Sequence, residues 1–393
     1  MVRAKIHKIL GRTRIVATVL ITLGRLPKGL ELARAAHAGG YRVLVADPFR
    51  LNLCRASRCV EQTFTVSAPN PAPAHFHRDL LQIIDRERVD FVLPVSEETL
   101  HVAKLEDRLP DRTRLLCMPH ERLLELHDKG RFMALMQQLG LPSVRSMPAD
   151  ADSAAEFVRA ADVIIKPTLS SSGHGVRKLA AGSRLPSRRA GQLLQAWLPG
   201  PEISTFSVVS DGHVLGTVGY RACITAGSVA VCFESLSTLQ PEITQTIERI
   251  ALEFEWRGFL SFDWRADGHG MFYPIECNPR ATSGVHFVDP GDLSRALFTP
   301  QRGQPFRLRT ERRLQQFYPA LTATQAAGLR GEPWRPNLRL LFGCRDVCFT
   351  RQDPMPFLSM PVNSWPIMRR AFLDGQSFGD ASTADIGWYP PAS

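Results

Sequence analysis

The sequence has 393 residues, of which 44% are hydrophobic and 22% are charged, and its formal net charge is +10. This length and balance exclude a disordered chain and predict two or three domains with their own cores. The positive charge favours an anionic ligand. No basic run interleaved with aromatic residues and no nucleic-acid signature is present, so no nucleic-acid partner is expected.

Eight cysteines are spread along the chain, and none forms a Cys-x-x-Cys pair or a zinc-like spacing with histidine. We therefore expect free thiols in a reducing compartment, and a cytoplasmic location. No segment is apolar over enough residues to span a membrane, so no membrane contact is predicted.

The first predicted elements form a strand–helix–strand unit. Basic residues 1–14 and apolar residues 15–23 resemble the start of a signal peptide, but no small-residue cleavage site follows. We interpret them as a basic tail and a buried parallel strand, followed by a helix and a second strand. Only Gly24 and Gly29 stand where a dinucleotide site needs three glycines, so the unit need not bind a dinucleotide. Asp47, after the second strand, is predicted to cap the strand end rather than bind a ribose.

A helix at 79–87 and a strand at 89–95 continue this domain. Ser96-Glu97-Glu98 then opens another helix with acids in its first turn, where the helix dipole favours them. We predict that both glutamates cap the helix, with a functional role as the alternative.

A loop of small residues, Ser170 to Gly175, follows the strand Val163–Lys166. Serines and glycines let a backbone approach phosphate oxygens closely, and Lys166 places a cation at the strand end. A phosphate-binding loop and an ordinary surface loop are both compatible with this pattern.

An antiparallel region follows, and it leads to a hairpin that carries three oxygen ligands and a cation. Asp263 lies on the first strand, Glu276 and Asn278 lie two residues apart on the second, and Arg280 comes next. Hard oxygen ligands beside a guanidinium suit Mg²⁺ and a polyphosphate. The alternative is an amphipathic hairpin with solvated carboxylates, and Pro274 weakens the prediction of a central strand.

Together these motifs resemble the ATP-grasp superfamily, the carboxylate ligases related to biotin carboxylase and carbamoyl phosphate synthetase. The resemblance covers residues 15–290. Its strongest element is Glu276-x-Asn278-Pro-Arg280. The supporting elements, in chain order, are Asp128-Lys129, which is also predicted to start a helix, Lys166 with the Ser/Gly loop, Gln195-x-x-Leu198-x-Gly-Pro-Glu202 and Asp263.

The resemblance implies a role for each matching residue, with ATP and one or two Mg²⁺ (or Mn²⁺) as cofactors. Catalysis would use Arg280 and Lys166, and the metal ligands would be Asp263, Glu276 and Asn278. The nucleotide would be held by Lys129, Lys166, Ser171, Ser172, Gly173, Gly175, Gln195, Ala196, Leu198 and Glu202. Candidate substrate contacts are Arg221, Arg280, Ser283, Gly284 and His286, with an exposed arginine and a plain glycine turn as the alternatives.

Two departures from the family pattern stand out. The hairpin between Asp263 and Glu276 is about one residue longer than expected, which leaves its register open, and Gln195 stands where the family often has an acid. No Met-Lys-Met biotin-carrier motif is present, so a biotin-linked carboxylase is not expected.

The predicted fold is α/β with α+β parts: a Rossmann-like pre-ATP-grasp domain, ATP-grasp subdomains with antiparallel sheets, and a C-terminal extension. The predicted divisions are residues 1–14, 15–115, 116–195, 196–300 and 301–393. The extension is rich in proline and tryptophan but apolar enough to be ordered, with a short helix expected at 365–373.

The predicted function is an ATP- and Mg²⁺-dependent ligase that couples a small-molecule carboxylate to an amine through an acyl phosphate, in peptide or natural-product biosynthesis. A homodimer is one option for its assembly. The alternatives are a kinase-like enzyme that stops after phosphorylation, and a non-catalytic nucleotide-binding protein.

Overall fold

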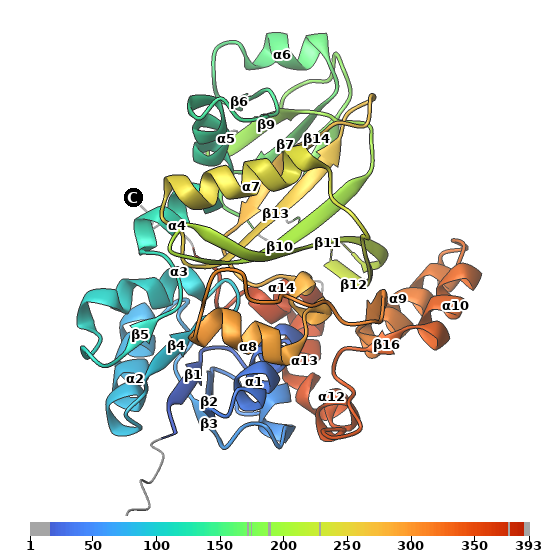
Figure 1. Cartoon of the computed structure of the whole chain (residues 1–393). Helices are drawn as coiled ribbons and strands as arrows, with labels where there is room; N and C mark the ends of the chain where they lie inside the picture. The colour runs from blue at the N-terminus through green and yellow to red at the C-terminus, as the bar shows by residue number, and fades with distance from the viewer. Residues whose placement is uncertain are drawn as a thin grey trace, which may run out of the picture.

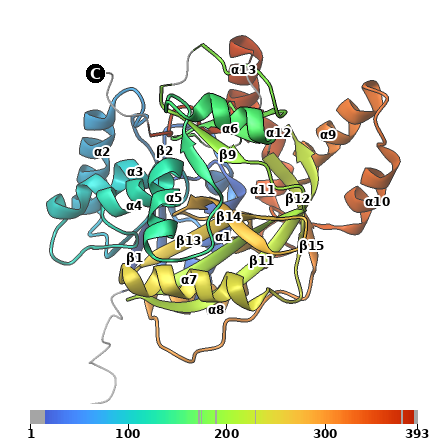
Figure 2. The same ribbon diagram turned by 90° about the horizontal axis from the view of Figure 1, so that it is seen from above.

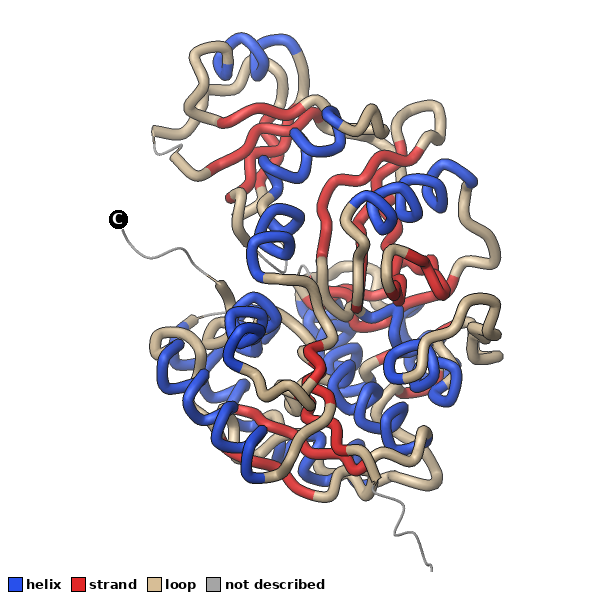
Figure 3. Tube along the Cα trace, turned by 60° about the vertical axis from the view of Figure 1, so that its left-hand side comes forward, coloured by secondary structure: helices blue, strands red, loops and turns tan. Residues whose placement is uncertain are grey.

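The computed structural model describes residues 16–170, 173, 175–187, 190–227, 229–375 and 378–388. Within these ranges three sheets are stacked along the molecule, with the parallel sheet at the bottom of Figure 1, the largest sheet in the middle and the smallest at the top. Figure 3 shows the strands in separate groups with helices around them.

The first unit is a five-stranded parallel sheet in the order β3-β2-β1-β4-β5. The buried strand β1 consists of apolar and threonine side chains, as expected for a strand covered on both faces. Helix α1 begins with a proline in its first turn, where the missing N–H costs nothing. The elements of this unit are β1 (Thr18–Ile21), α1 (Pro27–Ala38), β2 (Arg42–Asp47), η1 (Leu53–Ala56), β3 (Gln62–Thr65), α2 (Pro73–Arg86), β4 (Phe91–Leu93), α3 (Thr99–Val102), η2 (Ala103–Arg108) and β5 (Arg114–Leu115).

β2 and β3 lie on one side of β1, whereas β4 and β5 lie on its other side. The direction in which successive strands are added therefore reverses between β1 and β4, and this position is a topological switch point. Ligands of open α/β sheets bind outside the carboxyl ends of the strands at such a point. Asp47 lies nearby but accepts hydrogen bonds from the Gly24 and Arg25 amides, so in this structure it fixes the loop after β1.

The second unit is a small four-stranded antiparallel sheet in the order β6-β9-β7-β8. Asp128 caps helix α5 by accepting from the amides of Gly130 and Arg131, as the sequence predicted. Its elements are α4 (His120–His127), α5 (Lys129–Gln138), β6 (Ser146–Pro148), α6 (Ala154–Ala160), β7 (Val163–Pro167), β8 (Arg177–Leu179) and β9 (Gln192–Ala196).

The third unit is built on a seven-stranded sheet in the order β14-β13-β10-β11-β12-β15-β16. Helix α7 lies over β11 (Figure 2) and buries Ile243, Ile247 and Ile250, which fall on one helical face. The elements are β10 (Glu202–Ser210), β11 (His213–Ala226), β12 (Val229–Ser235), α7 (Pro241–Glu253), β13 (Gly258–Ala266), β14 (Phe272–Asn278), η3 (Ser283–Phe287) and α8 (Pro290–Phe298).

The C-terminal extension is ordered where it is described, as predicted from its apolar content. It adds two strands to the seven-stranded sheet, and its last part returns to the first unit, where Asp385 forms an ion pair with buried Arg25 at 2.8 Å. Its elements are β15 (Arg313–Gln315), α9 (Phe317–Leu329), α10 (Arg335–Gly343), β16 (Arg345–Asp346), α11 (Met355–Leu358), α12 (Met360–Asn363), α13 (Trp365–Asp374) and α14 (Phe378–Thr383).

No helix among the described residues is long and apolar enough to cross a membrane.

Candidate active site

The hairpin β13–β14 places the two predicted metal carboxylates opposite each other. Asp263 is paired with Glu276, and the next pair of residues in the ladder is Trp264 and Pro274. Ile275 therefore has no partner on β13 and forms a bulge on β14. The bulge accommodates the additional residue of this hairpin and fixes the register that the sequence left open. β14 is the edge strand of its sheet, which explains why Pro274 is tolerated there.

Asp263 sits in a half-buried, hydrogen-bonded position. The Ser204 hydroxyl donates to one of its oxygens at 2.6 Å, and the Asn278 amide nitrogen donates to the other at 2.9 Å. Burial, together with the charge of Glu276, raises the pKa of Asp263 to about 7. Two half-buried carboxylates held opposite each other favour a bound cation, which would compensate both charges.

The predicted ligand set fits Mg²⁺ in its chemistry. No group of three or more His, Cys, Asp and Glu side chains within the described ranges is arranged to hold a metal by itself. Asp263, Glu276 and Asn278 offer two carboxylates and one amide. Mg²⁺ commonly takes one or two protein carboxylates and completes its shell with water and substrate phosphates, so this small set is sufficient.

Two buried lysines from the second unit approach the hairpin. Lys129 Nζ lies 3.5 Å from Glu276 and donates to the Ser170 carbonyl at 2.8 Å. Lys166 Nζ donates to the Gln195 side-chain oxygen at 2.9 Å and to the carbonyl of the bulged Ile275 at 3.0 Å. Burial lowers the pKa of Lys166 to about 8. Both cations therefore lie beside the carboxylate pair, where polyphosphate oxygens are predicted.

Four of the predicted nucleotide-binding residues lie from the end of β9 to the start of β10, and one of them contacts Lys166. Gln195 is buried and is the acceptor for Lys166, so the position that often holds an acid in the family here holds a neutral oxygen that still binds the lysine. Ala196 ends β9, and the Leu198 carbonyl accepts from Arg265 Nε at 2.8 Å. Glu202 begins β10 and forms an ion pair with Arg265 at 3.2 Å.

The predicted phosphate loop is described only in part. Ser171 and Ser172 lie outside the described residues. Gly173 and Gly175 adopt positive φ angles of 69° and 73°. A side chain at Gly175 would also collide with Pro167, so glycine is required there for both backbone and packing reasons.

Arg280 follows β14 and connects the β13–β14 hairpin, here called the metal hairpin because it carries the predicted metal ligands, to the first unit. It donates to the Asn278 side-chain oxygen at 2.9 Å and forms an ion pair with Glu97 at 2.7 Å. Its Nε is buried and has no hydrogen-bond partner within the described parts of the chain, which leaves one donor for a ligand. Burial alone would lower the pKa of Arg280, but Glu97, Glu276 and Asp263 outweigh it and raise the pKa.

The prediction that Glu97 and Glu98 cap a helix is wrong. Neither side chain bonds the first turn of α3; Glu97 is the partner of Arg280, and Glu98 accepts from the amides of Val95 and Ser96. Glu97 instead pairs with Arg280, a largely buried arginine of the third unit. Because Arg280 is distant from Glu97 in the sequence, local sequence patterns could not predict this pair. The missed signal was that both glutamates follow β4 at the switch point of a parallel sheet.

Lys28 was also missed by the sequence analysis. It lies in the first turn of α1, on the other side of the switch point, and its Nζ donates to the Ala281 carbonyl at 3.0 Å. Burial and the nearby charge of Arg280 lower the pKa of Lys28 to about 7. Lys28, Glu97 and Arg280 thus form one charged group between the first and third units.

The remaining predicted substrate residues are Arg221, Ser283, Gly284 and His286. The Arg221 side chain is largely exposed and pairs with Glu234 at 2.6 Å. Ser283 begins η3 and is half-buried, whereas Gly284 is packed so tightly that an added Cβ would lie 2.4 Å from Phe206 Cβ. His286 is buried and lies 3.2 Å from Glu31. These contacts give Gly284 and His286 packing roles, and a substrate role for the four residues stays a prediction.

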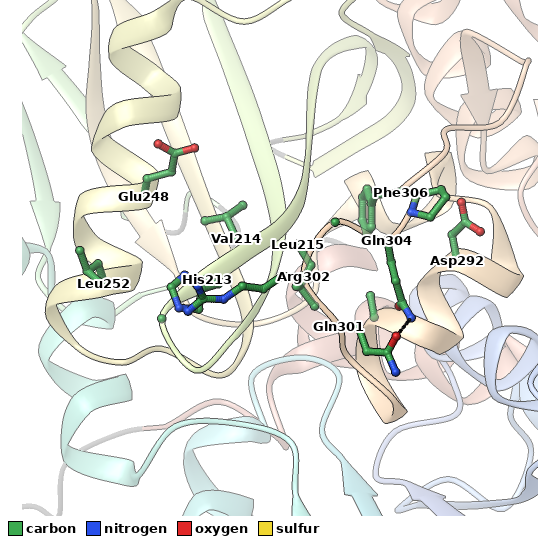
Figure 4. Close-up of a pocket in the computed structure, with 14 residues that line it drawn as sticks. His213, Val214, Leu215, Glu248, Leu252, Asp292, Gln301, Arg302, Gln304 and Phe306 are labelled. Carbon is green, nitrogen blue, oxygen red and sulfur yellow. Dashed lines mark hydrogen bonds between the residues drawn. The ribbon is translucent and has the colours of Figure 1, made fainter.

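A separate cavity lies away from these residues. About 550 Å³ opens between α7, the β10–β11 turn and the segment after α8, with His213, Glu248 and Arg302 among its lining (Figure 4). None of the predicted site residues lines it, so this cavity is separate from the charged cluster of the candidate active site.

No protein-family model matches the chain. It is 26% identical over 233 residues to the carbamoyl phosphate synthase large chain of Deinococcus radiodurans, and 26% identical over 274 residues to that of Deinococcus deserti. These alignments cover 53% and 64% of this chain but 22% and 26% of the relatives, so the chain spans about a quarter of their length.

Solved structures share the fold at lower identity. Staphylococcus aureus N5-carboxyaminoimidazole synthetase with ADP has a TM-score of 0.59 at 13% identity, covering 74% of this chain and 80% of that one. Campylobacter jejuni biotin carboxylase has 0.59 at 14%, covering 74% and 73%, and Bacillus licheniformis L-amino acid ligase has 0.54 at 17%, covering 72% and 74%. The chain has the ATP-grasp fold, which confirms the predicted resemblance and fold class.

Proposed function

We propose that this chain is a ligase that uses MgATP to join a small-molecule carboxylate to an amine, releasing ADP and phosphate. One observation carries the proposal: two lysines of the second unit meet a facing carboxylate pair and an arginine of the third unit, and the arginine is paired with Glu97 of the first unit. Bringing charges of both signs together at a buried position costs desolvation free energy. A ligand that binds to these charges would offset that cost.

Phosphoryl transfer brings two anions together, so positioning and charge neutralisation carry most of the catalysis. A carboxylate oxygen would form a bond to the γ-phosphorus of ATP as the bond to ADP breaks. Lys129 and Lys166 are placed to bind phosphate oxygens. Bound at Asp263, Glu276 and Asn278, Mg²⁺ would supply further neutralisation of the polyphosphate.

The amine would then attack the acyl carbon, lose a proton and expel phosphate, leaving an amide. Arg280 has a planar, permanently charged fork with one unused buried donor, which suits a carboxylate or acyl phosphate. Lys28 adds a second nearby cation from the first unit. We therefore place the donor carboxylate beside Arg280 and Lys28.

The likeness to an L-amino acid ligase supports amino acids as the first substrates to test, in keeping with a role in peptide or natural-product biosynthesis. The eight free cysteines fit a cytoplasmic enzyme.

The test is ADP release from the purified chain with MgATP and a panel of amino acids and other carboxylates, supplied singly and in pairs. Release that requires both a carboxylate and an amine supports the ligase. Release with one compound and a stable phosphorylated product favours the kinase-like alternative. MgATP binding with no release from any pair favours the non-catalytic alternative.

Glu276→Ala provides the residue-level test. It should lower ADP release by about 100-fold or more while the circular dichroism spectrum is unchanged, because it removes one of the two charges that would hold the metal. Glu253→Ala, on the surface of α7, is the matched control and should keep full activity. Unchanged ADP release in Glu276→Ala contradicts the proposal.

A further inference from the structure

Three cysteines meet where the C-terminal extension joins the seven-stranded sheet, and none of them belongs to the charged cluster of the candidate active site. Cys223 lies on β11, Cys232 on β12 and Cys344 at the end of α10 (Figures 1 and 2). The sulfur atoms of Cys232 and Cys344 are 3.9 Å apart, and Cys223 forms a side-chain hydrogen bond with Cys232. Cys232 is therefore in contact with both of the other thiols.

The three thiols differ in exposure and acidity. Cys232 is fully buried in an apolar cluster with Ile224 and Leu341, and its pKa is raised by its contacts with the other two thiols. Cys223 is half-buried, and the hydrogen bond from Cys232 lowers its pKa to about 7. The pKa of Cys344 is also lowered by its contact with Cys232.

The charged groups around Cys223 come from three neighbouring strands. Arg221 on β11 and Arg313 on β15 favour its thiolate, while Glu234 on β12 opposes it. Glu234 is bound by both arginines, at 2.6 Å and 2.9 Å, so its charge is largely compensated. Reactive cysteines occupy this kind of partly exposed, electropositive position.

The remaining five cysteines do not share these properties. Cys59 is half-buried, but burial raises its pKa. The other four are buried, and burial raises the pKa of each; they are Cys54, Cys117, Cys277 and Cys348.

We propose that Cys223 and Cys232 form a peroxide-reactive site, in which Cys223 takes up the oxidant and Cys232 closes a disulfide between β11 and β12. The Cys223 thiolate attacks one peroxide oxygen, the O–O bond breaks and hydroxide leaves, so sulfur is oxidised to a sulfenic acid as the peroxide is reduced. Cys232 sulfur then attacks Cys223 sulfur, the S–O bond breaks, and the leaving hydroxide takes the Cys232 proton as water. Two thiols and one hydrogen peroxide give one disulfide and two waters.

The site differs from a structural cysteine cluster in having both a half-buried thiol with a lowered pKa and a fully buried partner in contact with it. Joining β11 to β12 would also tie together two strands that support α9, because the apolar cluster around Cys232 includes Ala320 of that helix. The site is independent of the ligase proposal, and its test requires no substrate.

The experiment treats the reduced full-length protein with equimolar hydrogen peroxide, blocks the remaining thiols with N-ethylmaleimide and maps tryptic peptides. Cys223 and Cys232 fall in the same peptide, residues 222–249, whereas Cys344 falls in 340–345. The expected product is peptide 222–249 carrying no alkyl group and lighter by two hydrogens. A link between 222–249 and 340–345, or no disulfide at all, overturns the proposal.

The rate of thiol loss identifies the reacting residue. It should rise with pH to half its maximum near 7, the pKa of Cys223. Cys223→Ser should slow it about tenfold, since an ordinary thiol with a pKa near 8.5 is only a few per cent thiolate at pH 7. Cys59→Ser is the matched, equally half-buried control and should leave the rate unchanged. Equal slowing in both variants, or a rate independent of pH, overturns the assignment to Cys223.

Discussion

The ion pair between Glu97 and Arg280 joins the first unit to the metal hairpin, and Glu97→Gln tests it directly. The side chains are 5% and 13% exposed, and the atoms are 2.7 Å apart. Two charges with centres about 4 Å apart attract by about 4 kcal/mol at an effective dielectric of 20. Glutamine keeps a hydrogen-bond acceptor, and Asn278 still contacts the guanidinium. We therefore expect a loss of about half that energy, about 2 kcal/mol at pH 7.

The loss should depend on pH in a defined direction. Burial would raise the pKa of Glu97, but Arg280 and neighbouring cations outweigh it and lower the pKa below its usual value. The pair therefore stabilises the fold above the unfolded-state pKa of about 4.3, and this contribution disappears as pH falls through the lower folded-state pKa. The difference between wild type and Glu97→Gln should shrink accordingly.

The assay is urea unfolding of both proteins at pH 7 and at several lower values. Glu106→Gln is the matched control, because Glu106 pairs with Arg257 in a more exposed position and should contribute less than about 1 kcal/mol. In Glu97→Gln, Arg280 also loses the partner that positions it, so ADP release should fall about 10- to 100-fold with little change in MgATP affinity. A loss in Glu97→Gln no larger than in Glu106→Gln, or one that stays constant down to the lowest pH, refutes the reasoning.

Three further predictions concern the site and its surroundings. Mn²⁺ binding, followed by electron paramagnetic resonance, should weaken about fivefold from pH 7 to pH 6, because Asp263 with a pKa of about 7 must lose its proton to act as a ligand; affinity independent of pH contradicts this. Gly284→Ala should lower the free energy of unfolding by about 1–3 kcal/mol, because its Cβ would lie 2.4 Å from Phe206 Cβ; a thermal melt equal to wild type contradicts this. Lys28→Met should raise the KM for the carboxylate about tenfold and leave the KM for ATP unchanged, with Lys28→Arg partly restoring it; an effect on ATP alone places Lys28 elsewhere.

Short-range chemistry made much of the chain readable from its sequence. Continuous apolar runs predicted the parallel strands, and Asp128 predicted the start of α5, since a cap acts within one helical turn. Alternation along the hairpin placed Glu276 and Asn278 on one face, because successive side chains on a strand point in opposite directions. Helix starts were less accurate, since α2 begins at Pro73, six residues earlier than expected.

The position of the bulge in the metal hairpin could not be predicted from the local sequence. The sequence showed an additional residue between Asp263 and Glu276, but a bulge can form at several positions in a hairpin at similar energetic cost. Its place at Ile275 coincides with a contact from Lys166, which comes from a different sheet and binds the Ile275 carbonyl.

The sequence by itself determined the order of the main strands and helices and the ATP-grasp resemblance, and it was enough to predict Asp263 and Glu276 as metal ligands, because periodicity, caps and short motifs depend on neighbours along the chain. Only the tertiary structure decided that Glu97 pairs with Arg280, that Lys28 lies beside them, and that Cys223, Cys232 and Cys344 meet. These groups are far apart in sequence. Their pKa values and partners depend on burial and on charges that only folding brings within a few ångströms.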